Sequence, residues 1–309
     1  MVEGFGLAAQ TETPLVVVEA QRPGPATGMA THSGQGDLRF VLHASTDEFP
    51  RIVIAPGDVN ECFYAAIKAF NLAEKYQLPV IILTDKYLGE SFRTVPEFDQ
   101  RGISVDRGLL ISNGHTISEG YARYKNTPSG VSPRAIPGTK GGMHVASSYE
   151  HDEQGFEREE EEIRIMMHKK RFRKLESAQQ EIPDPELFGP EKADITILSW
   201  GSPKGPIKEA IKLLEKDRIT ANYLQIIFLS PFPAEKVKQA IDSAKRTVVI
   251  ENNMTSQLNS LIREHCLRDV ENKILRFDGR PFNPEDLYEE IKKLLTPPRK
   301  GYAVKAGEY

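Results

Sequence analysis

The sequence predicts an α/β protein, and two observations support this fold class. Apolar stretches at residues 51–55 and 78–85 flank a helical pattern, which is the order of a right-handed strand–helix–strand unit in a parallel sheet. From residue 194 onward, four strand patterns alternate with four helical patterns over short connections, as in a small doubly wound sheet. We therefore expect a first parallel sheet followed by a second α/β domain.

The N-terminal elements surround a loop rich in glycine and proline. Residues 3–9 have the composition of the end of a helix, because no capping residue precedes them. Thr13-Pro14 then breaks the chain before an apolar strand at residues 15–19. The loop at residues 21–28 follows this strand, and a second polar, glycine-bearing segment occupies residues 31–38. Ligands of open α/β sheets bind where strands end, so the first loop is a candidate site.

A helix is predicted between the two apolar strands of the first half. Asp58 or Asn60 can cap its start, and the pattern continues to about Tyr76. Small and apolar side chains recur along it at helical spacing: Cys62, Ala65, Ala66, Ala69, Phe70 and Ala73.

The segment from about residue 87 to residue 190 has a looser pattern, with loop sequences at residues 129–134 and 137–142. Its run Glu150-His151-Asp152-Glu153 contains side chains that bind metals. Adjacent residues of an extended chain point in alternating directions, however, so a surface or interface loop is favoured over a metal site.

Residues 157–174 are predicted to form a charged helix. The acidic residues come first and the basic residues last, which is the order that the helix dipole favours. A solvated helix is favoured over a nucleic-acid-binding patch, because Phe172 is the only aromatic residue in the basic half.

The second domain begins after residues 181–185, and its elements alternate regularly. Strands are expected at 194–200, 223–229, 246–251 and 273–277, and helices at about 204–216, 234–244, 255–265 and 284–295. Gly201 and Gly205 follow the first of these strands without the spacing of a dinucleotide or Walker loop, so we expect a tight turn there.

The composition excludes several functional classes. The 309 residues carry a formal net charge of −4, which gives no general attraction to nucleic acid or to an anionic membrane. No apolar run approaches the ~18 residues of a spanning helix, and the start does not resemble a signal peptide, so a cytoplasmic protein is predicted. The two cysteines, Cys62 and Cys266, form no Cys-x-x-Cys and cannot by themselves build an iron–sulfur or zinc site.

Arg22 is the one fixed cation in the loop at residues 21–28, and Thr27 adds a hydroxyl group. Proline restricts φ, and glycine lets backbone N–H groups approach a ligand closely. A planar guanidinium held in such a loop suits a carboxylate or a phosphate. A surface turn with a solvated arginine is the alternative, and the loop alone favours neither interpretation.

Several motifs of the chain occur together in one family of enzymes. They are Glu3-Gly4-Phe5-Gly6-Leu7-Ala8, Glu12-Thr13-Pro14, Gln21-Arg22-Pro23-Gly24-Pro25-Ala26-Thr27-Gly28, Gln35-Gly36-Asp37-Leu38, Ser129-Gly130-Val131-Ser132-Pro133-Arg134, Trp200-Gly201-Ser202 and Asp278-Gly279-Arg280-Pro281-Phe282. With them the chain resembles the alpha subunit of 2-oxoacid:ferredoxin oxidoreductases over nearly its whole length. Among these it looks most like the archaeal-type 2-oxoacid or 2-oxoglutarate enzymes.

The resemblance implies a division of the chain into three parts. Residues 1–105 match the back part of a thiamine diphosphate pyrimidine-binding domain, so the first sheet is expected to be partial. Residues 106–189 are an irregular connecting segment with the charged helix. Residues 190–309 match a small, doubly wound domain of the transketolase-C-terminal type.

The resemblance also implies an activity, namely oxidative decarboxylation of a 2-oxoacid to an acyl-coenzyme A. This activity would require a beta subunit, ferredoxin as electron acceptor and coenzyme A as co-substrate. Thiamine diphosphate and Mg²⁺ would be shared with or held by the beta subunit, which would also carry a [4Fe–4S] cluster. Arg22 matches the arginine placed at the 2-oxoacid carboxylate, and Thr27 and Gln35 match positions that line the same pocket. No catalytic residue or metal ligand carries over.

Two departures from the family pattern keep alternatives open. Family members carry about half a pyrimidine domain more at the N-terminus, with a Tyr-Pro-Ile-Thr-Pro motif and the glutamate that activates the cofactor. The family's Gly-His-Gly corresponds here to Ser45-Thr46-Asp47-Glu48, so its histidine does not carry over. The alternatives are a truncated or split, non-catalytic subunit that completes a thiamine diphosphate enzyme complex, and a regulatory binding module. Pyruvate, 2-oxobutyrate, 2-oxoglutarate and branched-chain acids all remain open as substrates.

Overall fold

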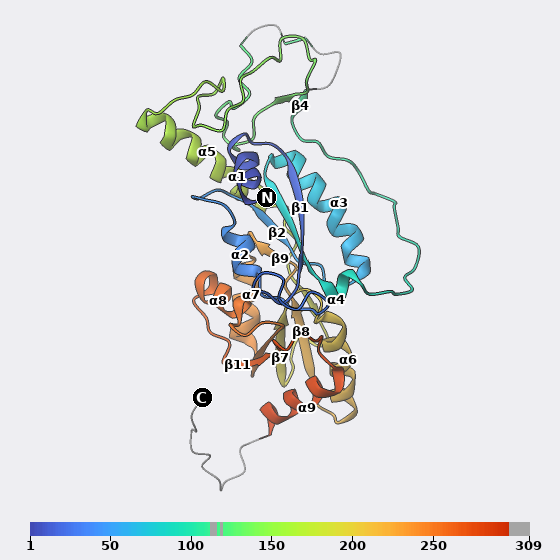
Figure 1. The fold of residues 1–309 in the computed structure, drawn as a ribbon. Helices are drawn as coiled ribbons and strands as arrows, with labels where there is room; N and C mark the ends of the chain where they lie inside the picture. Colours follow the sequence, from blue (N-terminus) through green and yellow to red (C-terminus); the bar gives the residue numbers. More distant parts are fainter. Residues whose placement is uncertain (112–115, 118–119, 297–309) are drawn as a thin grey trace.

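The computed structural model describes residues 1–111, 116–117 and 120–296 (Figure 1). Two sheets lie one above the other along the long axis of the molecule, and helices cover both of them (Figure 1). The first sheet has the strand order β1-β3-β2-β9 and the second has the order β11-β10-β7-β8-β6. The predicted α/β fold class is confirmed.

The first sheet contains the predicted strand–helix–strand unit. Strands β1 (Leu15–Gln21), β3 (Pro79–Asp85) and β2 (Ile52–Ile54) are parallel, and α3 (Val59–Tyr76) connects β2 to β3. Asp58 is the residue that caps α3, because its Oδ1 accepts a hydrogen bond from the Glu61 amide at 2.9 Å. Buried side chains of α3 and of the sheet form a continuous core: Ile52, Ile54, Ala65, Ala69, Leu72, Ala73, Val80 and Ile82.

The second sheet contains the predicted alternation of strands and helices. Four of its strands are parallel: β7 (Ile195–Ser199), β8 (Ala221–Gln225), β10 (Thr247–Glu251) and β11 (Asn272–Leu275). The helices between and after them are α6 (Lys204–Lys216), α7 (Ala234–Ser243), α8 (Gln257–Cys266) and α9 (Pro284–Leu295). The tight turn expected before α6 is present, with Gly201 at a φ of +65° and its carbonyl accepting from the Lys204 amide.

The single strand predicted at residues 223–229 is wrong. The chain forms β8 and then a separate strand, β9 (Phe228–Ser230), which pairs antiparallel with β2 of the first sheet. The Ala55 amide donates to the Ile227 carbonyl at 2.7 Å, so the end of this apolar run pairs with the first sheet. Several short elements were not predicted, among them α2 (Leu38–His43), and β6 (Glu186–Phe188) at the edge of the second sheet.

The remaining described elements lie mostly around the first sheet: α1 (Val2–Gln10), α4 (Lys86–Gly89), β4 (Leu110–Ile111), β5 (Arg134–Ala135) and α5 (Glu161–Gln179). The helix predicted at residues 3–9 is thus confirmed as α1. In the part of the chain that the structure describes, no helix has the length and hydrophobicity needed to span a bilayer.

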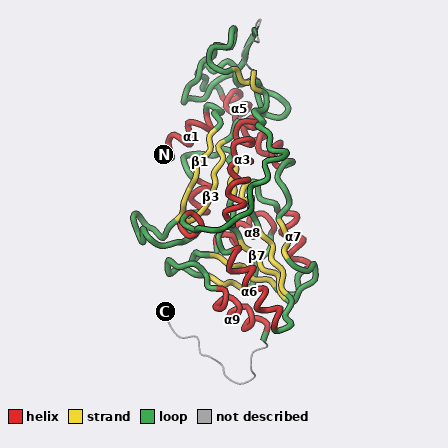
Figure 2. Tube along the Cα trace, turned by 90° about the vertical axis from the view of Figure 1, so that its right-hand side faces the viewer, coloured by secondary structure: helices red, strands yellow, loops and turns green. Residues whose placement is uncertain are grey.

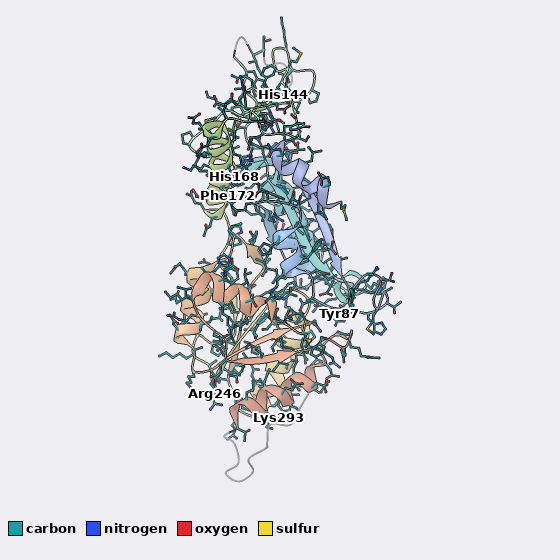
Figure 3. All side chains as sticks on the ribbon, turned by 60° about the vertical axis from the view of Figure 1, so that its left-hand side comes forward. Tyr87, His144, His168, Phe172, Arg246 and Lys293 are labelled. Carbon is teal, nitrogen blue, oxygen red and sulfur yellow. The ribbon has the colours of Figure 1, made fainter. Side chains whose placement is uncertain are left out.

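The carboxyl ends of the parallel strands of both sheets meet at the middle of the molecule. Helix α4, which directly follows β3, lies at this junction, as does its residue Tyr87 (Figures 1 and 3). Gln35 reaches across the junction, where its Nε2 donates to the carbonyl of Trp200 just after β7. Figure 2 shows the same junction as a band of loops between the two sets of strands. Loops that follow β1, β10 and β11 are therefore brought together there.

The prediction of a solvated charged helix at residues 157–174 is wrong in its basic half. In α5 the side chains of Lys170 and Lys174 are fully buried, and both form ion pairs with the buried carboxylate of Glu12. Lys170 Nζ lies 2.6 and 2.7 Å from the two Glu12 oxygens. Burial alone would raise the pKa of Glu12, but Lys174 and Lys170 hold that pKa far below its usual range.

We expect Glu12→Gln to destabilise the protein strongly. The amide cannot compensate the charges of Lys170 and Lys174, and breaking a buried ion pair typically costs about 3–5 kcal/mol. Urea unfolding of the full chain would measure the loss. Glu161→Gln, at an exposed position of the same helix, is the matched control and should change stability by less than about 0.5 kcal/mol. Similar effects of the two substitutions would contradict a structural role for the Glu12 pairs.

A second ion-pair cluster makes stability depend on pH. Arg171 donates to both oxygens of Glu150 at 3.0 and 2.6 Å, and Arg164 donates to one of them at 2.9 Å. Burial raises the pKa of Glu150, but the two arginines outweigh burial and lower it from 4.5 to about 2. A depressed pKa in the folded state means that this stabilisation is complete above about pH 4.5 and is lost as the pH falls towards 2.

Glu150→Gln should therefore lower the free energy of unfolding more at about pH 6 than at about pH 3. Urea unfolding of the wild type and of the variant at both pH values would measure the difference. An equal loss at the two pH values would show that Glu150 acts through packing and not through its charge.

Candidate functional site

The loop at residues 21–28 leaves the carboxyl end of β1 as a compact turn. The Met29 amide donates to the Pro23 carbonyl at 3.0 Å and closes the turn. Gly28 has a φ of +48°, and a side chain at this position would overlap the Pro23 carbonyl oxygen. Only glycine fits there, so the fold of the turn depends on this residue. The turn holds Arg22 at its base, directly after Gln21, the last residue of β1.

Arg22 lines a cavity of about 370 Å³ at the junction of the two sheets. The first half of the chain contributes Arg22 and Asp37 to its walls. The second half contributes Asn252, Asn253 and Met254, which follow β10, and Phe277, which follows β11. Each of these segments comes after the carboxyl end of a parallel strand, where ligands of α/β proteins bind.

The charged groups of this cavity have no partners within the described part of the chain. No ion pair or hydrogen bond there involves the guanidinium of Arg22, which is exposed, or the carboxylate of Asp37. Burial raises the pKa of Asp37, and burial together with the Asp37 charge raises the pKa of Glu19 on β1. An unpaired guanidinium beside a cavity can bind an anion without first breaking an ion pair.

The three residues that the sequence assigned to substrate binding have different surroundings. Arg22 lines the cavity. Thr27 is exposed on the same loop, and its hydroxyl makes no hydrogen bond to any described residue. Gln35 is 1% exposed and bonds to Trp200 and Asn252 behind the cavity wall, so its amide is already occupied. The assignment of these residues to a 2-oxoacid remains a prediction.

Hydrogen bonds fix the return segment of the loop to the second domain. The Gln35 amide donates to the Asn252 carbonyl at 2.8 Å, and the Asn252 amide donates to Gln35 Oε1 at 2.9 Å. The Ser33 amide donates to the Gly279 carbonyl at 3.0 Å. Gln257 Nε2 donates to the Gly36 carbonyl at 2.7 Å. These bonds make residues 33–36 a rigid wall shared by the two domains.

Sequence reasoning missed Asp37, Asn252, Met254 and Phe277 as cavity residues. Asp37 belongs to the quoted motif at residues 35–38, but nothing in the pattern places it in the same cavity as Arg22. Asn252 and Met254 come after the strand predicted at 246–251, and Phe277 is the last residue of the strand predicted at 273–277. The carboxyl ends of parallel strands are the one sequence feature that could have indicated these residues.

The run at residues 150–153 forms a buried structural contact. Glu150 binds Arg164 and Arg171, and His151 is fully buried with its Nε2 3.2 Å from the Gln10 carbonyl oxygen. Among the residues that the structure describes, no three metal-ligating side chains gather at one place. Cys62 and Cys266 lie on different helices, and burial raises the pKa of both thiols.

The chain is similar to known proteins over nearly its whole length. Residues 1–170 match the family model described as pyruvate flavodoxin/ferredoxin oxidoreductase, thiamine diphosphate-binding, and residues 193–287 match pyruvate:ferredoxin oxidoreductase core domain II. A 2-oxoacid:ferredoxin oxidoreductase subunit alpha from a Sulfolobus species is 38% identical over 100% of this chain and 48% of its own length. The 2-oxoglutarate synthase subunit KorA of Methanothermobacter marburgensis is 30% identical over 94% of this chain and 76% of its own.

A solved structure shows the same fold. The 2-oxoglutarate:ferredoxin oxidoreductase from Magnetococcus marinus, with 2-oxoglutarate, coenzyme A and succinyl-CoA bound, is 33% identical and superposes with a TM-score of 0.88. The match covers 96% of this chain and 51% of that one. The chain thus spans about half the length of the first curated relatives that it matches.

We expect Gln35→Ala to weaken the wall of the cavity. The change leaves the Trp200 carbonyl and the Asn252 amide without their partner, and an unsatisfied buried polar group costs about 1–3 kcal/mol. Urea unfolding of the full chain would measure this loss. Gln154→Ala, at an exposed position, is the matched control and should have little effect. Unchanged stability of Gln35→Ala would show that the two domains associate without this contact.

Proposed function

The chain belongs to the 2-oxoacid:ferredoxin oxidoreductase family, and on that premise we propose that it acts as an alpha subunit in the oxidative decarboxylation of a 2-oxoacid to an acyl-coenzyme A. The proposal includes a beta subunit as obligatory partner and ferredoxin as electron acceptor. It also includes a cytoplasmic location and the division of the chain into residues 1–105, 106–189 and 190–309.

The observation that carries this proposal is the position of Arg22. Its guanidinium lies at the carboxyl end of β1, beside a cavity of about 370 Å³, and it pairs with no described carboxylate. The planar guanidinium can donate two parallel hydrogen bonds to a carboxylate, a geometry that a lysine cannot reproduce. A 2-oxoacid presents such a carboxylate next to the carbonyl group that reacts. Arg22 would therefore orient the substrate in the cavity.

The described residues do not fit every cofactor of the proposed reaction. A diphosphate-bound Mg²⁺ needs several oxygen ligands, and the acidic side chains described here form no cluster of three. A [4Fe–4S] cluster needs four thiolates, whereas this sequence has Cys62 and Cys266. We therefore assign Mg²⁺, the diphosphate of thiamine diphosphate and the iron–sulfur cluster to the beta subunit. Thiamine diphosphate would supply the electron sink for decarboxylation, and coenzyme A would accept the acyl group.

Substitution of Arg22 tests the proposal. A charge-assisted, bidentate pair is worth about 1.5–3 kcal/mol, so Arg22→Lys should raise the KM for the 2-oxoacid by about tenfold or more. Arg22→Ala should raise it further. The KM for coenzyme A should remain near normal, because coenzyme A has no carboxylate group for Arg22 to bind. Steady-state kinetics of the complex reconstituted with its beta subunit, with each substrate varied separately, would measure these values.

Arg246→Lys provides the matched control, because Arg246 lies on the second domain far from the junction (Figure 3). It should leave both KM values unchanged. If Arg22→Ala shifts only the KM for coenzyme A, the loop binds phosphate and the assignment to the 2-oxoacid is wrong.

A further inference from the structure

Two large apolar side chains project from the second domain at the Arg22 cavity. Met254 follows β10 and is 69% exposed, and Phe277 follows β11 and is 63% exposed. Both line the cavity, and neither belongs to the hydrophobic core of its domain. Exposed methionine and phenylalanine at the carboxyl ends of parallel strands are placed where a ligand can cover them.

A buried hydrogen-bond network holds the turn that carries Met254. The carboxylate of Glu251, at the end of β10, is fully buried and accepts four hydrogen bonds from uncharged donors. The donors are Trp200 Nε1 at 3.1 Å, Asn253 Nδ2 at 2.8 Å, Ser256 Oγ at 3.1 Å and the Leu258 amide at 2.9 Å. Because this carboxylate fixes both sides of the turn, the backbone of Met254 is well anchored while its side chain faces outward.

The loop that carries Phe277 is held in a similar way. The Arg276 amide donates to the Glu251 carbonyl at 3.0 Å, and Asp278 pairs with the Arg276 side chain. Asp278 Oδ1 also accepts from the Arg280 amide at 3.0 Å. Two residues beyond Phe277, the Gly279 carbonyl receives the Ser33 amide of the first domain. Phe277 thus has a defined position relative to the segment that includes Asp37.

The charges of the cavity favour a ligand with a single carboxylate. Arg22 is the one cation among the described residues that line it, and Asp37 is a half-buried acid in the same wall. One carboxylate can pair with Arg22. A second carboxylate in the cavity would lie near the Asp37 oxygens and the apolar groups of Met254 and Phe277, which cannot compensate its lost hydration.

We infer that the Arg22 cavity selects a 2-oxoacid with one carboxylate and an apolar carbon chain, and that Met254 and Phe277 determine this selectivity by contacting the chain. The inference rests on the proposed function and specifies its substrate class. Arg22 would bind the carboxylate end, and the two apolar side chains would contact the opposite end. The selectivity would then come from the second domain, although the anchor comes from the first.

A comparison of kcat/KM for different 2-oxoacids in the reconstituted complex tests the inference. We expect kcat/KM for 2-oxobutyrate to exceed that for 2-oxoglutarate by at least about tenfold, because the second carboxylate of 2-oxoglutarate would lose its hydration without gaining a partner cation in the cavity. Reduction of ferredoxin, followed with pyruvate, 2-oxobutyrate and 2-oxoglutarate in turn, would give the three values.

Variants that add a cation at the apolar positions provide the second measurement. Phe277→Arg and Met254→Lys should each raise the ratio of kcat/KM for 2-oxoglutarate to that for 2-oxobutyrate by about tenfold, because a new cation can pair with the distal carboxylate. Phe156→Arg and Met143→Lys make the same chemical changes at exposed positions that do not line the cavity. These two control variants should leave the ratio unchanged.

The outcomes separate the inference from the proposed function. A complex that prefers 2-oxoglutarate, or cavity variants whose ratio matches that of the control variants, would overturn the inference while the oxidoreductase function stands. A complex that oxidises none of the three acids would overturn the function and the inference together. Preference for 2-oxobutyrate with a shifted ratio in Phe277→Arg and Met254→Lys would support both.

Discussion

The candidate site depends on the hydrogen bonds that join Gln35 to the carboxyl ends of β7 and β10. The segment from β1 to α2 has no regular structure of its own, so its buried backbone groups need partners from elsewhere. Gln35 provides them by exchanging backbone and side-chain bonds with Asn252 while also bonding to Trp200. Because this contact joins the two domains at their ligand-binding edges, the Arg22 loop and the turn after β10 form one cavity.

A different interaction holds the central part of the chain on the first sheet. Residues 106–189 contain few described strands and one long helix, and the inward side of that helix is charged. Glu12 accepts from Lys170 and Lys174, while Arg123 donates to the Glu12 carbonyl and to Gln77. Buried ion pairs recover their desolvation cost only when the partners are well matched, so they add geometric specificity more than net stability. Helix α5 is thereby fixed in one position against α3.

Local patterns predicted the elements whose formation depends mainly on local interactions. Helices α3, α6 and α9 combine helical periodicity with clear boundaries, and the sequence placed them closely. The sequence predicted a single strand where the structure has β8 and β9. The two parts of this mostly apolar segment pair with different sheets, and only the tertiary pairing shows where one strand ends and the other begins. The buried face of α5 was misjudged because lysines on a helix are usually solvated, and Glu12 lies far away in sequence. Likewise, the sequence indicated Arg22 from its loop, whereas Asp37, Met254 and Phe277 meet it only in the folded chain.

Each domain contributes one side of the cavity, and substitutions on the two sides differ in how much they disturb the backbone. The Arg22 turn is constrained by Gly28 and by the hydrogen bond from the Met29 amide to the Pro23 carbonyl, so substitutions within it disturb the backbone. Met254 and Phe277 are exposed, and their backbones are fixed by Glu251, Arg276 and Asp278. Exposed side chains on an anchored backbone can be replaced at little cost in stability. The relatives that match this chain are named for 2-oxoacids and for 2-oxoglutarate. On the proposed function, the turns after β10 and β11 are where such proteins can differ while the Arg22 turn stays the same.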